Sequence, residues 1–405
     1  MAKVLALSFG RKMSNTDVML KEVLKKCEEA GHEIKFMRPD DLEIKPCIGC
    51  CGCVVGIMSG RTNGTCVFKD DFHLVEDAYY DADAVIIGSP VYETSPSGTF
   101  KTFCDRFGPS HDLAFLTEAK KDRIAQGNDL LPDERVFKPR VGALVGVGGA
   151  MTENWTIMTI PIMYESMMSA GVDVIDTHVY YGAMAVDHVL GVPEQMERMD
   201  EMAQHIIDAL AAQTDEERTK WRGASNYACP VCHQSIVRVT PGTDLVECTI
   251  CGINGKIEMV DGKATYTFSE EEQLRSRMNY GGKLEHRNEI AHGAMTQKHT
   301  ENLAELKKRT YTSANNSCLG WFGTSRKELQ QEPEKFSVTT ASLISDRSRE
   351  LARKTGGLRH TPAVGLDAAV TTKILQWFFR WSSFLLCSIY AVAPRTTHAY
   401  KLMAK

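Results

Sequence analysis

Five cysteines lie within twenty residues of one another in the stretch PCIGCCGCVVGIMSGRTNGTC, which runs from Pro46 to Cys66. Cys47, Cys50 and Cys53 follow one another at intervals of three residues, and Cys66 comes after a further gap of twelve residues. A compact group of thiolates with a more distant fourth is a common way to hold a [4Fe–4S] cluster. We therefore predict a cluster on these four residues, and metal-free thiols and a zinc site are the alternatives.

A second set of four cysteines forms two matching pairs further along the chain. Two residues separate Cys229 from Cys232 and Cys248 from Cys251, and fifteen residues lie between the pairs. This spacing is typical of a zinc ribbon or of rubredoxin, in which two hairpin turns close a tetrahedral all-sulfur site. We favour a structural zinc ion, because small four-thiolate modules are most often stabilised by one. Iron is the alternative, and it would make the module an electron input.

Polar residues that suit a phosphate group follow the first apolar run of the chain. The stretch SFGRKMSNT comes directly after KVLAL and precedes a segment with helical periodicity. Hydroxyl groups, free backbone N–H groups and the positive end of a helix dipole together attract phosphate. The predicted contacts are Ser8, Arg11, Ser14, Asn15 and Thr16. The alternative is that Ser14 and Asn15 only cap the helix.

Two further loops contain residues that suit a flat ring. The stretch GSPVYETSPSGTFKTFCDR places Tyr92, after Pro90 and Val91, where its side chain could lie beside such a ring. The stretch GVGGAMTEN contains Gly148 and Gly149, at which the backbone could approach a ligand closely. Each loop alone is weak evidence. Three such loops at one edge of a sheet predict a site for a phosphorylated ring compound.

Strand and helix patterns alternate over the first two hundred residues. The predicted strands are residues 3–8, 33–37, 83–90, 140–149 and 171–181, and the predicted helices are residues 16–30, 70–80, 99–107, 154–170 and 193–212. This alternation predicts an α/β fold with a flavodoxin-like, doubly wound, five-stranded parallel sheet in the order 2-1-3-4-5. In that order a ligand lies beyond the carboxyl ends of the first and third strands. We expect the charged residues 120–140 to be a surface excursion.

The three loops and the first cysteine group resemble the NADPH-dependent FMN reductase superfamily, and in particular its iron–sulfur flavoprotein branch. The resemblance covers residues 1–212, although the gap before Cys66 is wider than in that branch. It implies FMN with its phosphate on Ser8, Arg11, Ser14, Asn15 and Thr16 and its isoalloxazine along Pro90, Val91, Tyr92, Gly148 and Gly149. It also implies NAD(P)H or a ferredoxin-type carrier as the electron donor, and a flavin, quinone or nitro compound as the acceptor. Relatives assemble as dimers or tetramers, so a homo-oligomer is expected.

The remaining sequence divides by composition. A polar linker at residues 213–226 precedes the four-cysteine module at 227–268, a charged helical segment at 269–310 and a basic tail at 311–405. The tail contains an apolar stretch at 374–393 that Arg380 interrupts, so we predict no membrane span there. Contact of the tail with anionic lipid is an open alternative.

The distribution of charge argues against nucleic acid as a partner. Residues 307–405 carry 16 Lys and Arg against 6 Asp and Glu, a net charge of +10, which leaves −15 on the first 306 residues. An acidic body has little with which to neutralise phosphates. The opening residues do not match a signal peptide, so we expect a cytoplasmic protein with reduced thiols. The prediction is an FMN-dependent oxidoreductase, and the alternative is an electron-transfer flavoprotein without a substrate of its own.

Overall fold

The computed structural model describes residues 1–296 and 300–309. Residues 1–298 form one compact unit, which contains both β-sheets of the described chain, and residue 299 begins a second unit. The basic tail, including the apolar stretch at 374–393, lies outside the described residues. None of the helices that the structure describes is long and apolar enough to cross a membrane.

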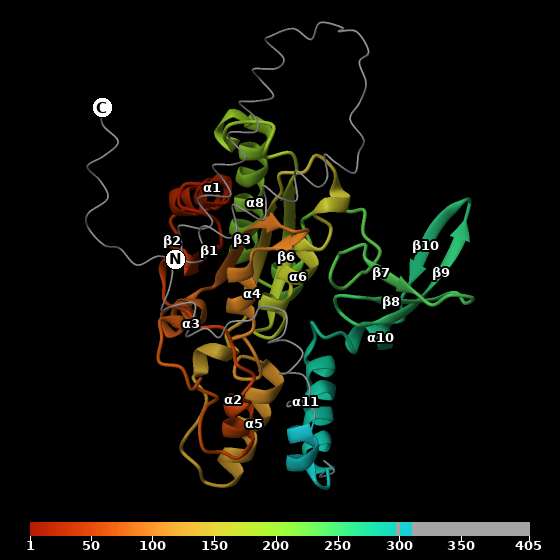
Figure 1. Cartoon of the computed structure of the whole chain (residues 1–405). Coiled ribbons are helices and arrows are strands. Elements are labelled where there is room, and N and C mark those ends of the chain that lie inside the picture. Colours follow the sequence, from red (N-terminus) through yellow and green to blue (C-terminus); the bar gives the residue numbers. More distant parts are fainter. Residues whose placement is uncertain (297–299, 310–405) are drawn as a thin grey trace, which may run out of the picture. The chain divides into compact units, whose positions relative to one another are not determined.

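The larger sheet has five parallel strands in the order β2-β1-β3-β5-β6, as the strand pattern of the sequence predicts (Figure 1). Its strands are β1 (Lys3–Ser8), β2 (Glu33–Met37), β3 (Ala84–Tyr92), β5 (Arg140–Val147) and β6 (Val172–Tyr180). A two-residue strand, β4 (Ser95–Pro96), pairs antiparallel with the end of β3. The predicted flavodoxin-like α/β fold is therefore confirmed.

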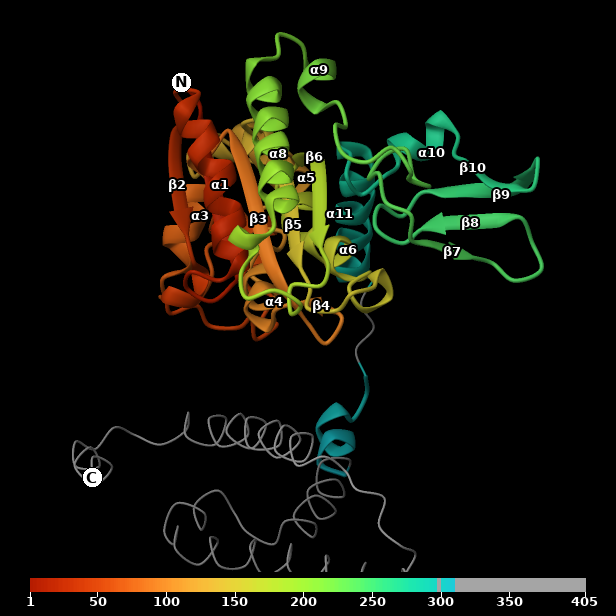
Figure 2. The ribbon, with the colours of Figure 1, turned by 90° about the horizontal axis from the view of Figure 1, so that it is seen from above.

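Helices cover both faces of this sheet (Figure 2). On one face lie α1 (Asn15–Glu29) and α8 (Pro193–Ala211), and on the other lie α3 (Phe72–Asp81), α4 (Gly98–Cys104), α6 (Thr159–Met163) and α7 (Glu165–Met168). Side chains of β1 alternate between the two layers: Val4 and Ala6 pack with the first pair of helices, and Leu5 and Leu7 pack with the second group. This period of two is what a strand buried on both faces requires.

The helix predicted over residues 154–170 is instead three short pieces. A 3₁₀ turn (Glu153–Trp155) comes first, and α6 and α7 follow. Pro161 lies in the first turn of α6, where its missing N–H is not needed, so a new helix begins there. The break places Tyr164 between α6 and α7 with its side chain fully buried.

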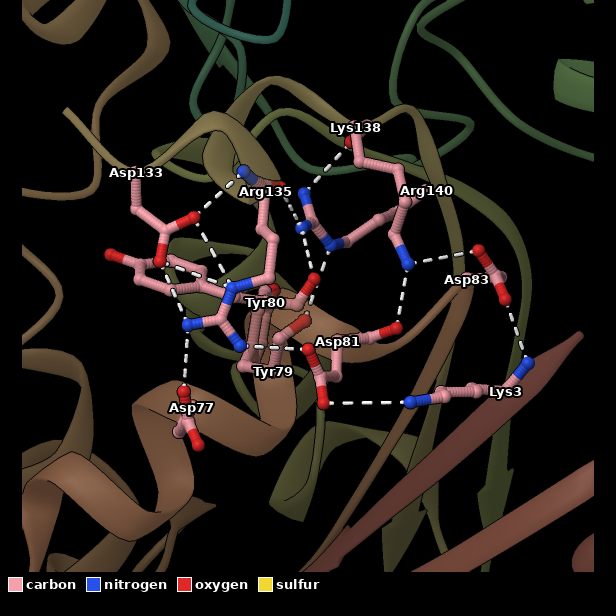
Figure 3. Close-up of polar contacts among 10 residues, drawn as sticks. All are labelled: Lys3, Asp77, Tyr79, Tyr80, Asp81, Asp83, Asp133, Arg135, Lys138 and Arg140. Carbon is pink, nitrogen blue, oxygen red and sulfur yellow. Dashed lines mark hydrogen bonds and ion pairs between the residues drawn. The ribbon is translucent and has the colours of Figure 1, made fainter. Parts of the chain in front are cut away.

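The charged residues 120–140 lie mostly at the surface, as predicted, but two arginines of this segment point into the fold. This segment includes the end of α5 (Leu113–Ala125) and a 3₁₀ turn (Glu134–Phe137), and both Arg123 and Arg140 are buried. Arg140 donates hydrogen bonds to the carbonyls of Tyr79 at 3.2 Å and Tyr80 at 2.7 Å, which lie in the last turn of α3 (Figure 3). A guanidinium that satisfies the carbonyls at the end of a helix can be buried at little cost.

The cysteine segment at 46–66 is not a continuous loop, because it contains α2 (Gly52–Met58), and the linker contains α9 (Asp215–Thr219). The four-cysteine module forms a separate antiparallel sheet in the order β10-β9-β8-β7. Its strands are β7 (Val237–Val239), β8 (Leu245–Cys248), β9 (Asn254–Val260) and β10 (Lys263–Thr267), and they are followed by α10 (Glu270–Leu274) and α11 (Tyr280–Met295).

Candidate functional site

A cavity of about 1020 Å³ opens at the carboxyl edge of the parallel sheet. It lies where β1, β3 and β5 end, which is the edge at which doubly wound sheets bind ligands. Its wall contains every ligand contact predicted from the sequence except Ser8: Arg11, Ser14, Asn15, Thr16, Pro90, Val91, Tyr92, Gly148 and Gly149. Three loops that are far apart in the sequence therefore form one site.

Ser8 lies beneath the cavity wall and supports the first loop from below. Its buried hydroxyl donates a hydrogen bond to Oδ1 of Asp17 at 2.5 Å and accepts one from the backbone N–H of Gly10 at 3.3 Å. Oδ2 of Asp17 accepts a hydrogen bond from the backbone N–H of Met13 at 2.8 Å. The sequence interpretation missed Asp17, and the signal for it was an acidic residue in the first turn of α1. Ser8 and Asp17 therefore hold the first loop in its conformation.

Ser14 has the side chain that most clearly lacks a partner in the cavity wall. Its Oγ atom is buried, and within the described residues 1–296 and 300–309 it has no hydrogen-bond partner. Ser14 is the residue before α1, a helix of 15 residues whose free N–H groups face the same loop. Arg11 and Lys12 also line the cavity. A buried hydroxyl, a helix N-terminus and two cations fit a phosphate monoester.

Gly10 allows the first loop to close tightly around this position. A Cβ atom on Gly10 would lie 2.7 Å from Oγ of Ser14 and 2.8 Å from Cβ of Thr16. Both distances are shorter than carbon atoms tolerate, so a larger residue would push Ser14 out of place. The sequence interpretation did not single out Gly10, because its role depends on contacts that close only in the folded loop.

The second wall of the cavity is a tight hairpin between β3 and β4. Glu93 and Thr94 form its turn with φ angles of +46° and +70°, a left-handed conformation that non-glycine residues adopt at a cost. Oγ of Ser89 accepts a hydrogen bond from the backbone N–H of Ser97 at 3.0 Å and ties the hairpin to the start of α4. Tyr92 remains 52% exposed at the cavity wall, where it can contact a ring.

The third wall is the loop after β5, in which two glycines lie under neighbouring side chains. A Cβ atom on Gly148 would lie 2.5 Å from Cγ2 of Thr156, and one on Gly149 would lie 2.7 Å from Cγ of Met184. The backbone N–H of Ala183 donates a hydrogen bond to the carbonyl of Gly148 at 3.0 Å. The loop is therefore packed from two sides, and its backbone is positioned to contact a flat ligand.

The thiols of the first cysteine group are spread over an exposed surface. Cys47 and Cys50 are exposed, and Cys53 and Cys66 are half-buried. Among the described residues, these four sulfurs are not drawn together as tightly as those of the second cysteine group. A four-iron cluster holds its sulfurs farther apart than one ion does. The pKa of the Cys53 thiol is raised, mainly by burial and to a smaller extent by the nearby Cys66 and Cys47 thiols.

A buried arginine holds the two ends of this cysteine segment together. The guanidinium of Arg106 forms an ion pair with the carboxylate of Asp70 at 2.8 Å and donates a hydrogen bond to the carbonyl of Lys45 at 2.8 Å. Lys45 precedes the segment and Asp70 follows it, so one side chain closes the base of the loop. Hydrogen bonding to Arg106 lowers the pKa of Asp70 to about 2 and keeps it charged. Arg106 also lies near Cys66, the last cysteine of the segment.

The four cysteines of the module meet at one buried point. Their sulfur atoms lie within 4.8 Å of one another, and Sγ of Cys229 is 3.4 Å from Sγ of Cys251. Sγ of Cys232 is likewise 3.4 Å from Sγ of Cys248. Four converging soft ligands fit one tetrahedral zinc or iron ion. The predicted metal-ligand set is therefore brought together as the sequence spacing indicates.

One hydrogen bond fastens this centre to the parallel-sheet part of the unit. The hydroxyl of Tyr164, between α6 and α7, donates to the backbone carbonyl of Cys232 at 2.6 Å, and both groups are buried. The ring of Trp221 stacks on the ring of His233, with centroids 4.5 Å apart. The four cysteines also belong to the same apolar cluster as the residues of α3, α4 and α6. The module is thus packed against this helix layer.

Comparisons with known proteins agree on the nature of the parallel-sheet region. Residues 2–170 match the family model described as NADPH-dependent FMN reductase. A flavone synthase of Aspergillus candidus is 28% identical over 314 residues, which are 75% of this chain and 94% of that protein. An iron-sulfur flavoprotein of Archaeoglobus fulgidus is 27% identical over 221 residues, which are 54% of this chain and 97% of that protein. A solved flavone reductase matches with a TM-score of 0.59 and 24% identity, covering 89% of this chain and all of that one, and this likeness shows the fold.

Proposed function

We propose that the protein binds FMN and uses NAD(P)H to reduce a small planar acceptor, because residues 2–170 match the NADPH-dependent FMN reductase family. Family membership makes the protein an oxidoreductase. The observation that carries the finer proposal is the buried, partnerless hydroxyl of Ser14 at the start of α1, inside a cavity that three loops enclose.

Each wall of the cavity has a part in this proposal. Arg11, Ser14, Asn15 and Thr16 hold the phosphate by charge, hydrogen bonding and the helix dipole. The backbones at Pro90–Tyr92 and Gly148–Gly149 orient the isoalloxazine between the second and third loops. When bound, FMN supplies the hydride or electron transfer, and the residues position it and exclude water. No side chain is assigned as a proton donor.

The names of two relatives suggest one class of acceptor. The matching protein of Aspergillus candidus is a flavone synthase, and the matching solved structure is a flavone reductase. Flavones are flat, conjugated aromatic ketones, which suits a cavity built to hold one flat ring against another. We propose a flavone-type ketone as a substrate, beside the quinones, nitro compounds and free flavins that are expected of the superfamily.

The cysteine groups suggest a second candidate function, that of an electron carrier for a partner protein. Cys47 and Cys50 are exposed, so a [4Fe–4S] cluster on Cys47, Cys50, Cys53 and Cys66 would be accessible to a ferredoxin-type donor. The neighbouring Arg106 would offset part of its negative charge. In the module we propose a structural zinc ion, because all four sulfurs are buried, and a redox iron is the alternative. We propose a cytoplasmic location, where metal-ligating thiols stay reduced, and a homo-oligomer.

The proposal is tested by loading the full chain with FMN anaerobically and mixing it with NADPH or NADH. We expect oxidation of the nicotinamide when flavone or a naphthoquinone is present. Ser14→Ala should weaken FMN binding about tenfold, because it removes one hydrogen bond to a charged phosphate. Thr265→Ala, an exposed hydroxyl on β10, is the control and should leave binding unchanged. A chain that takes up no FMN would refute the proposal, and one that binds FMN but oxidises no nicotinamide would favour the carrier function.

A further inference from the structure

Two large apolar side chains lie exposed in the wall of the proposed flavin cavity. Trp155 is 59% exposed and Met184 is 87% exposed, and both line the cavity. Tryptophan is highly buried on average, and exposed apolar groups that gather at a cavity mark a binding surface. The proposed flavin contacts lie on other residues, namely Pro90–Tyr92 and Gly148–Gly149. Trp155 and Met184 are therefore available to a second ligand.

Met184 lies directly over the backbone along which the flavin ring is proposed to lie. A Cβ atom on Gly149 would lie 2.7 Å from Cγ and 2.8 Å from Sδ of Met184. The backbone next to Met184 is fixed, because the N–H of Gly182 donates to the carbonyl of Ala150 at 2.7 Å. The methionine side chain is flexible and polarizable, so it can adapt to a ring that enters beneath it.

Trp155 has a rigid base and a free ring. It ends the 3₁₀ turn Glu153–Trp155, and the backbone N–H of the next residue, Thr156, donates to the carbonyl of Glu153 at 2.8 Å. Thr156 is 2% exposed and packs against Gly148. The position of the tryptophan is thus set by the same glycine loop that holds Met184. Trp155 and Met184 are therefore both held next to the loop after β5, and the outer parts of their side chains are exposed.

The cavity is large enough for more than the nucleotide. Its volume of about 1020 Å³ lies at the upper end of the roughly 300–1,000 Å³ that small-molecule sites have. Its cations Arg11 and Lys12 belong to the phosphate loop, whereas the lining also contains the apolar residues Ala150 and Ala183 and two carboxylates, Glu93 and Asp187, besides His188. The second ligand would therefore be uncharged, flat and apolar where it meets these side chains.

We propose that Trp155 and Met184 form an apolar clamp that closes on the outer ring of a planar acceptor and selects acceptors with two or more rings over acceptors with one. This inference rests on the proposed function, because it concerns the acceptor of the same flavin site. A single-ring quinone stacked on the flavin would not reach the clamp, whereas a fused or linked second ring would lie between the two side chains. The clamp binds the acceptor and takes no part in the chemical step, so its loss raises KM and leaves kcat unchanged.

The test compares menadione, which has two fused rings, with 1,4-benzoquinone, which has one, in the FMN-loaded full chain. We expect Trp155→Ala and Met184→Ala each to raise the KM for menadione at least fivefold and the KM for benzoquinone less than twofold. Met259→Ala is the matched control, because Met259 is 68% exposed on β9 and outside the cavity lining, and it should change neither KM. The FMN dissociation constants of Trp155→Ala and Met259→Ala should stay unchanged.

Equal changes in the two KM values, or none, would overturn the clamp while leaving the oxidoreductase proposal in place. If the wild-type chain reduced neither quinone, direct binding would still decide the matter. Flavone would then be titrated into the FMN-loaded protein without a reductant, with flavin absorbance as the readout. Weaker flavone binding by Trp155→Ala, with Met259→Ala unchanged, supports the clamp, and identical binding by wild type and both variants refutes it.

Discussion

The two cysteine-rich regions of this protein contain the same kind of side chain, yet the fold brings the sulfurs tightly together in the module and not in the segment at 46–66. In the module, the two cysteine pairs lie in equivalent turns. The residue after each pair is left-handed, with φ of +52° at His233 and +77° at Gly252, and its backbone N–H bonds back to the first cysteine of the pair. In the segment at 46–66, Cys51 is the N-cap of α2, and α2 contains Cys53. The predicted ligands Cys47, Cys50 and Cys53 are therefore divided between a loop and a helix.

The difference teaches which spacing rules are local. A Cys-x2-Cys knuckle is a single turn, so four residues of sequence largely determine where its two sulfurs lie. The cysteine segment depends on contacts with residues outside it, namely the Asp70–Arg106 pair at its base and Arg123 of α5, whose guanidinium bonds to carbonyls of the segment. Arg123 donates hydrogen bonds to the carbonyl of Thr62 at 2.7 Å and to that of Ile57 at 3.3 Å. The positions of the sulfurs in such a site therefore depend on contacts with residues elsewhere in the fold.

The largest difference in stability should appear when one sulfur is removed from each region in turn. Cys232→Ser takes a buried ligand from the module, and because metal binding and folding are coupled we expect a loss of stability on the order of 5 kcal/mol together with loss of the ion. Cys50→Ser changes an exposed side chain, and in protein prepared without a cluster it should alter stability by less than about 0.5 kcal/mol. Metal analysis and chemical denaturation measure both. Equal destabilisation by the two variants would remove the contrast between the regions.

A smaller, pH-dependent effect should report how firmly the module is docked. Lys283 on α11 is 5% exposed and lines a cavity of about 740 Å³ together with Cys251 and Asp112. Burial lowers its pKa from 10.5 to about 8, although Asp112 and Asp173 oppose the shift. The unfolded chain then binds more protons than the folded chain between pH 8 and 10.5. Relative to Lys283→Met, the wild type should therefore gain about 3 kcal/mol of stability across that range.

The measurement for Lys283 is chemical denaturation of both proteins at pH 7.5, 9 and 10.5. The difference between them isolates Lys283 from the other groups that titrate in alkali. The variant should be the more stable protein at the lowest pH, because it no longer buries a charged amine. If the difference in unfolding free energy between the two proteins did not change with pH, the ammonium group of Lys283 would be solvated and α11 would be loosely packed.

The smallest effect concerns the hydrogen bond between the parallel-sheet region and the module. Tyr164→Phe leaves the buried carbonyl of Cys232 without its donor and should cost about 1–3 kcal/mol. Tyr79→Phe is the matched control, because its buried hydroxyl donates to the carbonyl of Ser166 at 2.9 Å, away from the metal ligands. Both variants should lose similar stability, but only Tyr164→Phe should release metal faster to a chelator. Equal release rates would mean that the bond supports the fold and not the metal centre.

Much of the fold could be predicted because its signals are short-range. The apolar strands, their alternation with helices and the order 2-1-3-4-5 follow from runs of a few residues each. The interpretation failed where long-range contacts override local patterns. Arg140 looks like a surface residue in a charged segment, but it is buried because the end of α3 supplies carbonyl acceptors for its guanidinium.

For the candidate site, residue types and order in the sequence were enough to identify the three loops and the four-cysteine module. Only the tertiary structure placed Ser8 beneath the wall, added Gly10 and Asp17 to the loop, and brought Trp155 and Met184 to the cavity. The physical reason is that parallel strands must end at a common edge, so a sequence of this pattern determines that the loops meet. Which side chains then face the ligand depends on how the loops pack on one another, as Thr156 packs on Gly148 and Met184 on Gly149, and no local pattern records that packing.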